Sequence, residues 1–179
     1  MRVLRFRDTL DSWDPAFIGA LAGNFRVITF EYSGMGRSTG ARATTMDAMV
    51  DDIHDLAGGL KLDRFVLGGW SMGGAVVQEA AAHMPDRISH LIIIAAGPPG
   101  KAFWVPEKAF LDAAAKPVND LADEEILFFR PSSDASRAAA KASWGRIHAA
   151  RPICRRRCRS RVLPNRRRRS PSSAPIARA

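Results

Sequence analysis

A single serine stands among four glycines in the segment VLGGWSMGGAVVQ, residues 66–78, where an apolar run gives way to a helical pattern. Glycine is among the poorest helix formers, so four glycines at the start of a helix must serve a backbone need. A sharp turn from a strand into a helix is such a need, because residues without a side chain permit close approach and unusual backbone angles. The chain is therefore constrained to a strand–turn–helix unit at this point.

The residues around the serine match G-x-S-x-G, with Gly69 and Gly73 two positions before and after Ser71. On a tight strand-to-helix turn, such a serine projects its hydroxyl above the sheet, and bulkier residues at either glycine would clash. The Met72 N–H then lies at a helix N-terminus, where it can stabilise an oxyanion. The pattern predicts a nucleophile elbow; the alternative is an ordinary turn that carries an inert serine.

Short runs of β-forming residues alternate with amphipathic segments along the first half of the chain, which predicts parallel βαβ units. Asp14 is placed to cap a helix that begins at Pro15, and Thr44 and Asp47 have capping-box spacing. The last strand of the series is almost wholly apolar, as expected for a central parallel strand. We expect strands at 3–6, 26–32, 64–69 and 88–97 and helices at 15–23, 44–60 and 72–84.

Composition divides the chain into three parts, which we predict to be a partial α/β core at 1–97, a helical segment at 98–150 and a disordered tail at 151–179. Residues 1–150 carry 16 Lys and Arg against 18 Asp and Glu, a net charge of −2, whereas the tail carries 11 arginines and no acidic residue. The formal charge of +9 therefore belongs to the tail, which has no periodicity and little to bury.

The arginine-rich tail has three interpretations. Its arginine runs could contact nucleic acid or an acidic partner, but no aromatic residue is interleaved for base stacking, which argues against nucleic acid. Cys154, Cys158 and His148 would supply three zinc ligands without a fourth, so we expect no metal site. An abrupt Arg/Pro/Ser-rich stretch is also typical of an out-of-frame reading of a GC-rich gene, and we hypothesise such a frameshift here.

The glycine-rich segment GMGRSTG, residues 34–40, is a second candidate motif. It lacks the third glycine of the dinucleotide fingerprint, where Thr39 stands instead, and it has no G-K-[ST] for a phosphate loop. We interpret it as a structural turn.

The chain resembles the α/β-hydrolase superfamily, through FRVITFEYSGMGRSTG, the helix with Asp51 and Asp52, and RFVLGGWSMGGAVVQEAAAHMPDRISHLIIIAAG. The resemblance implies a mainly parallel sheet flanked by helices, with a helical cap at about 98–150. It also implies a serine nucleophile at Ser71, oxyanion donors at the Phe6 and Met72 amides, and a small-molecule acyl substrate such as an ester, thioester, lactone or amide. The pocket would be apolar and include Trp70, and no cofactor would be needed.

A working serine needs a histidine base and an acid to orient it, and in this family both follow the serine on later loops. His54, His83 and His90 are each placed where a structural role is expected, and His148 lies inside the cap-like segment. The acidic residues of the same segment are expected on a solvated face: Asp120, Asp123, Glu124, Glu125 and Asp134. We therefore expect a hydrolase fold incomplete at both ends and an acyl-enzyme chemistry that is inactive as the chain stands.

The alternative is a non-catalytic remnant or binding protein whose tail docks on nucleic acid or an acidic partner. No apolar run reaches the length of a membrane span, and the charged start MRVLRFRDTLDSWD does not read as a signal peptide. A cytoplasmic protein without membrane contact is the expectation. The oligomeric state is not indicated.

Overall fold

The computed structural model of the chain describes residues 2–3, 9–100 and 106–158, with side chains for 9–100 and 106–150. Three parallel strands form its sheet in the order β1-β2-β3: β1 Arg2–Val3, β2 Phe65–Trp70 and β3 Ile88–Ile94. Arg2 pairs with Gly68, and Gly68 pairs with Ile92. The predicted strands at 64–69 and 88–97 are confirmed, and the latter ends three residues early, before Ala95.

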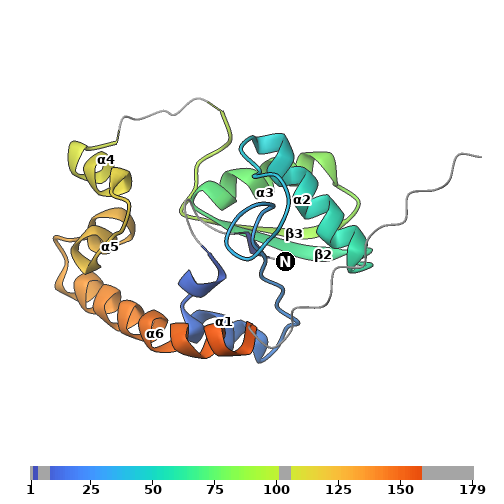
Figure 1. Cartoon of the computed structure of the whole chain (residues 1–179). Helices are drawn as coiled ribbons and strands as arrows, with labels where there is room; N and C mark the ends of the chain where they lie inside the picture. Colours follow the sequence, from blue (N-terminus) through green and yellow to red (C-terminus); the bar gives the residue numbers. More distant parts are fainter. Residues whose placement is uncertain (1, 4–8, 101–105, 159–179) are drawn as a thin grey trace, which may run out of the picture.

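Helices α2 (Met46–Gly59) and α3 (Met72–His83) cover one face of the sheet (Figure 1). Helix α3 contacts β2 and β3, and α2 packs against α3, so the buried residues of both helices join those of β2 in the main core. Its fully buried members come from both helices, β2 and the segment before α2: Tyr32, Ile53, Leu67, Val76 and Val77. This core holds the end of β2 and the start of α3 in place.

Helix α1 (Pro15–Ala22) begins as predicted, because the Asp14 side chain accepts a hydrogen bond from the Ala16 N–H at 2.9 Å. The predicted cap of α2 is wrong by one residue. Thr45, not Thr44, is the N-cap and accepts from the Ala48 N–H, so no capping box forms. Thr44 and Thr45 are both competent caps, so the sequence leaves the choice open, and in the structure Thr45 takes the extended backbone of an N-cap.

The cap-like segment contains α4 (Lys108–Ala115), α5 (Leu121–Phe128) and α6 (Asp134–Cys158). These helices gather to one side of the sheet, and α6 runs alongside α1 (Figure 1). The helix continues eight residues into the segment for which the composition predicted disorder, since arginine extends an existing helix at little cost. Residues 159–179 lie outside the described residues.

One predicted strand does not form in the structure, and another lies partly outside the described residues. Residues 26–32 are extended with a single β-bridge at Thr29 and form no strand among the described residues. β propensity makes a segment extended, but a strand also needs a partner along its length. For the strand predicted at 3–6, β1 covers Arg2–Val3, and residues 4–8 lie outside the described residues.

β3 is an edge strand of the described sheet and not the predicted central one. Its residues Ile92 and Ile93 are 48% and 43% exposed. An apolar run is compatible with burial on both faces, but what covers it depends on neighbouring elements.

Of the helices described, none has the length and apolar character required to cross a membrane.

Candidate active site

Ser71 stands between β2 and α3, at the carboxyl end of the parallel strands. Its backbone angles, φ 54° and ψ −124°, lie where residues with a side chain are strained. The Ser71 N–H donates to the Ile94 carbonyl at 2.9 Å, which ties the turn to the end of β3. Among the described residues, the Ser71 hydroxyl caps no backbone N–H of α3. The turn is therefore strained in a way that a capping role does not explain.

The glycines on either side of Ser71 are required by close backbone approach. A Cβ on Gly69 would lie 2.1 Å from the Gly73 carbonyl oxygen, so the first turn of α3 fits only against a bare backbone. A Cβ on Gly74 would lie 2.4 Å from the Ala96 Cβ, at the end of β3. These contacts give Gly69 and Gly74 steric roles, and Gly73 supplies the carbonyl that lies against Gly69.

Met72 is the first residue of α3, so its N–H is among those at a helix N-terminus that lack an intrahelical partner. Such a donor suits an anion, because the helix dipole adds a partial positive charge at that end. The role of the Met72 amide as an oxyanion donor stays a prediction. Phe6, the other predicted donor, lies outside the described residues.

Trp70 joins the core to the cap-like segment through its ring. The ring centre of Trp70 lies 6.1 Å from that of Trp13. It lies 5.5 Å from the ring centre of Phe128, which belongs to α5. Both separations are in the range of favourable aromatic pairs. Trp13 itself is 9% exposed and stacks on Phe17 of α1. An aromatic cluster of four residues thus adjoins the candidate nucleophile.

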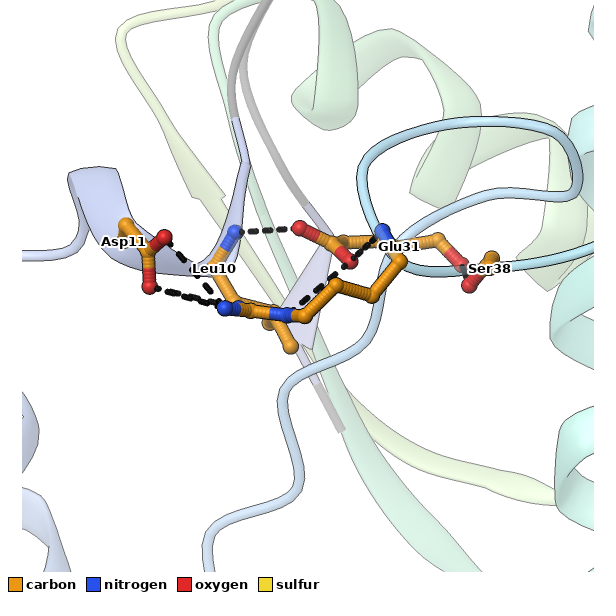
Figure 2. A network of polar contacts seen from close by, with 5 residues as sticks. Leu10, Asp11, Glu31 and Ser38 are labelled. Atoms are coloured by element: carbon orange, nitrogen blue, oxygen red, sulfur yellow. Dashed lines mark hydrogen bonds and ion pairs between the residues drawn. The ribbon is translucent and has the colours of Figure 1, made fainter. Parts of the chain in front are cut away.

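A buried acid, Glu31, organises the segment that precedes α1, and it was not among the predicted site residues. One of its carboxylate oxygens accepts from the Leu10 N–H at 3.0 Å, and the other accepts from the Arg37 N–H at 2.7 Å. Figure 2 shows the carboxylate directed at Leu10, while Ser38 donates from its hydroxyl to the Glu31 carbonyl. The available signal was an acid that ends an apolar run just before a glycine-rich turn.

That turn is the segment interpreted above as structural. Gly34 and Gly36 both have positive φ, 67° and 54°, which favours glycine at each. A Cβ on Gly36 would lie 2.2 Å from a carboxylate oxygen of Glu31. The glycine-rich turn therefore closes around Glu31.

The four histidines are placed away from hydrogen-bonding contact with Ser71 in the described part of the chain. His54 is exposed beside Asp55, and His83 lies 3.5 Å from Glu79 in the last turn of α3. His90 is exposed on β3. The His148 ring centre lies 4.0 Å from that of Trp144 with the planes tilted by 33°, and its Nδ1 is 2.9 Å from the Trp144 carbonyl oxygen.

One acidic residue of the cap-like segment does not lie on a solvated face as predicted. Asp123 is 4% exposed and forms a capping box with Asp120 at the start of α5. Its carboxylate also pairs with Lys116 at 2.6 Å, and the hydrogen bond from that ammonium lowers the pKa of Asp123. Asp123 thus fastens α4 to α5, because the chain folds back and brings a cation to it.

Comparison with known proteins connects this geometry with one family. The sequence model described as alpha/beta hydrolase fold matches residues 6–149. An alpha/beta hydrolase fold protein from Chitinophaga pinensis superimposes with a TM-score of 0.71 at 30% identity, over 82% of this chain and 53% of that chain.

Two curated relatives are similar over a shorter stretch. A putative carbamate hydrolase, RutD, of Rhizobium rhizogenes is 40% identical over 84 residues, which are 46% of this chain and 32% of that protein. A pimeloyl-[acyl-carrier protein] methyl ester esterase of Aliivibrio salmonicida is 35% identical over 86 residues, 48% of this chain and 31% of the relative. The chain spans about a third of the length of these curated relatives.

Proposed function

This chain belongs to the alpha/beta hydrolase fold family, and from that membership we propose that it carries the nucleophile of a serine hydrolase acting on an ester or a related acyl bond. Ser71 attacks the acyl carbonyl, the alcohol or amine leaves, and an acyl-enzyme forms on the serine oxygen. Water then releases the acid. The names of the two curated relatives, a carbamate hydrolase and a methyl ester esterase, support this class of bond.

One observation carries the proposal: Ser71 keeps a strained, left-handed backbone at the junction of β2 and α3. Strain of this kind costs about 1–3 kcal/mol and persists where the surroundings enforce it, which is common at functional sites. The Gly69 contact with the Gly73 carbonyl supplies the enforcement. The Met72 N–H at the start of α3 would hold the oxyanion.

The apolar part of the substrate would lie against the aromatic cluster. Trp70 precedes the nucleophile, and Phe128 reaches it from α5. Large, flat side chains of this kind bury apolar acyl groups well. We therefore expect a preference for an apolar acyl group over a charged one.

Turnover is proposed to be slow for the chain as it stands. No described histidine hydrogen-bonds to Ser71, and without a base the serine keeps its proton until attack. A serine site that lacks its partners still retains about 10³-fold catalysis through oxyanion and binding contacts. Acylation by an activated ester should therefore be detectable although multiple turnover is weak.

The test is acylation by p-nitrophenyl acetate, followed by mass spectrometry of the intact protein and its peptides. We expect an acetyl group on the Ser71 peptide that accumulates faster than in Ser71→Ala. Equal labelling of wild type and Ser71→Ala would contradict the nucleophile. Rapid turnover abolished by Ser71→Ala would support the nucleophile and contradict the proposed slow step.

A further inference from the structure

We infer that Glu31 is a positioning residue for the reaction at Ser71. Its carboxylate fixes the turn η1 (Leu10–Ser12), so that Trp13 packs against Trp70, the residue bonded to the nucleophile. This inference rests on the proposed function, because the reaction at Ser71 is itself proposed. The packing of Trp13 against Trp70 can be tested without it.

The Glu31 carboxylate serves two segments at once. Its side chain is 3% exposed, and its two oxygens accept from two different backbone donors, Leu10 on one side and Arg37 on the other. A buried carboxylate that accepts backbone N–H groups forms charge-assisted hydrogen bonds, which are stronger than neutral ones. The segment before α1 is thus fixed to the glycine-rich turn through one side chain.

The Arg37 side chain adds a second connection between Glu31 and η1. Its guanidinium lies 3.8 Å from the Glu31 carboxylate and 3.2 Å from the Asp11 carboxylate. Leu10 and Asp11 are the first two residues of η1, so the turn is held through its backbone and through a side chain. The Asp11 contact is more exposed to solvent and contributes less than the buried Leu10 contact.

The position of η1 is passed on to the elbow through two indole rings. Trp13 directly follows η1 and is buried, so its ring cannot move independently of that turn. The ring centre lies 6.1 Å from that of Trp70 with the planes at 44°. Trp70 is the last residue of β2. A displacement of η1 therefore changes the surface beside Ser71 without contact between Glu31 and the substrate.

The chemistry of Glu31 makes its role specific to a carboxylate. The Leu10 and Arg37 N–H groups meet different oxygens of the Glu31 carboxylate. Glutamine replaces one of these oxygens with an NH₂ group, so one of the two N–H groups would face a donor. Aspartate keeps the charge but is one methylene shorter, so it cannot reach both donors from the same backbone position. Glu31→Gln and Glu31→Asp are thus two independent ways to release η1.

Asp52 supplies a matched control. From α2 it accepts hydrogen bonds from the backbone N–H and the hydroxyl of Ser33, at the start of the glycine-rich turn. Asp52→Asn removes a carboxylate that holds this turn but, among the described residues, makes no hydrogen bond or ion pair with η1. If loss of either carboxylate only loosened the glycine-rich turn, the Glu31 and Asp52 variants would show equal effects.

The first experiment measures near- and far-ultraviolet circular dichroism of the full chain. Two indoles this close couple their transitions, and the contribution of the pair is identified as the signal lost in Trp70→Phe. We expect Glu31→Gln and Glu31→Asp to lose at least half of that signal at a temperature where the chain is folded, and Asp52→Asn to keep it. Retention of the full signal in a folded Glu31 variant would overturn the inference, as would equal loss in Asp52→Asn.

The second experiment measures binding of phenylboronic acid, which forms a reversible tetrahedral adduct with a reactive serine, with Ser71→Ala as the reference. We expect Glu31→Gln to bind about tenfold more weakly than wild type, since small displacements beside a reacting group have effects of this size or larger. Unchanged affinity despite a lost indole signal would overturn the positioning role. Absence of Ser71-dependent binding in wild type would contradict the proposed function and leave the indole result to decide the packing relationship.

Discussion

The Arg146 guanidinium of α6 hydrogen-bonds the carboxylate of Asp14, the residue that caps α1, although the two are 132 residues apart in the chain. The Arg146 Nε donates at 2.9 Å to one carboxylate oxygen, and its Nη2 donates at 2.6 Å to the other. The pair fastens the last described helix to the first. Paired hydrogen bonds from a guanidinium are the strongest form of this contact.

The Asp14–Arg146 pair should make stability depend on pH. The Arg146 hydrogen bonds lower the pKa of Asp14 from 3.8 to about 2, with help from Ser143 and the Ala16 N–H and against the effect of burial. Because the folded pKa is below the unfolded one, the stabilisation is present above about pH 4 and is lost as the pH falls toward 2. Asp14→Asn should lower the free energy of unfolding by about 1 kcal/mol at pH 7, and by less at pH 3.

Urea unfolding of both forms between pH 3 and 7 measures this difference. Asparagine caps helices as well as aspartate, so the change isolates the ion pair from the cap. Arg146→Gln should have a similar effect, and the double variant should be no worse than either single one. A difference that stays constant over this pH range would contradict the assignment.

The approach of Gly69 to the first turn of α3 should make this position intolerant of any side chain. We expect Gly69→Ala to lower the free energy of unfolding by about 3 kcal/mol, because its Cβ overlaps the Gly73 carbonyl. Gly58→Ala in α2 is the control, since a Cβ there meets nothing within 4 Å. It should raise stability by about 0.5 kcal/mol through helix propensity. Chemical denaturation of the two variants decides, and equal effects would show that the elbow is not sterically closed.

The left-handed backbone of Ser71 should be relieved by glycine. Ser71→Gly is expected to raise the free energy of unfolding by about 1 kcal/mol, because φ 54° carries no Cβ penalty for glycine. Ser71→Ala keeps the penalty and should leave stability nearly unchanged. Thermal unfolding of both variants measures the difference, and a Ser71→Gly variant less stable than Ser71→Ala would exclude stored strain at the elbow.

Tyr32 should be replaceable by phenylalanine without loss. Its side chain is 1% exposed, and its hydroxyl has no hydrogen-bond partner among the described residues. A buried hydroxyl without a partner costs about 1–3 kcal/mol, so Tyr32→Phe should raise the free energy of unfolding by about 1 kcal/mol. Denaturant unfolding at neutral pH tests this, and a loss of stability would indicate a partner for the hydroxyl.

Tyr32→Phe should also alter how the free energy of unfolding depends on pH in alkaline solution. Burial, and then the nearby Asp52 carboxylate, raise the pKa of the Tyr32 phenol above its usual range. The folded state therefore keeps this proton when the unfolded chain loses it, and the associated stability is lost as the pH rises above about 10. The free energy of unfolding of Tyr32→Phe should fall less steeply with rising pH than that of the wild type. Parallel alkaline titrations of the two proteins, followed by circular dichroism, measure the slope.

The units that could be predicted from the sequence are those whose physics is local. The strand, turn and helix around Ser71 depend on residues only a few positions apart, and so does the cap that Asp14 gives to α1. Glycine tolerance, capping and apolar periodicity act within one or two turns of backbone, so they can be read in order along the chain. The family resemblance drew on the same local units.

Contacts between groups far apart in the chain depend on the tertiary structure. Glu31 finds Leu10 21 residues away, Asp14 finds Arg146, and Asp123 is buried by the fold of the chain around it. The extended segment 26–32 and the exposed edge of β3 likewise depend on what packs beside them. Local propensity states how a segment can bend, but its partners follow from the packing of whole elements, which no spacing in the sequence specifies.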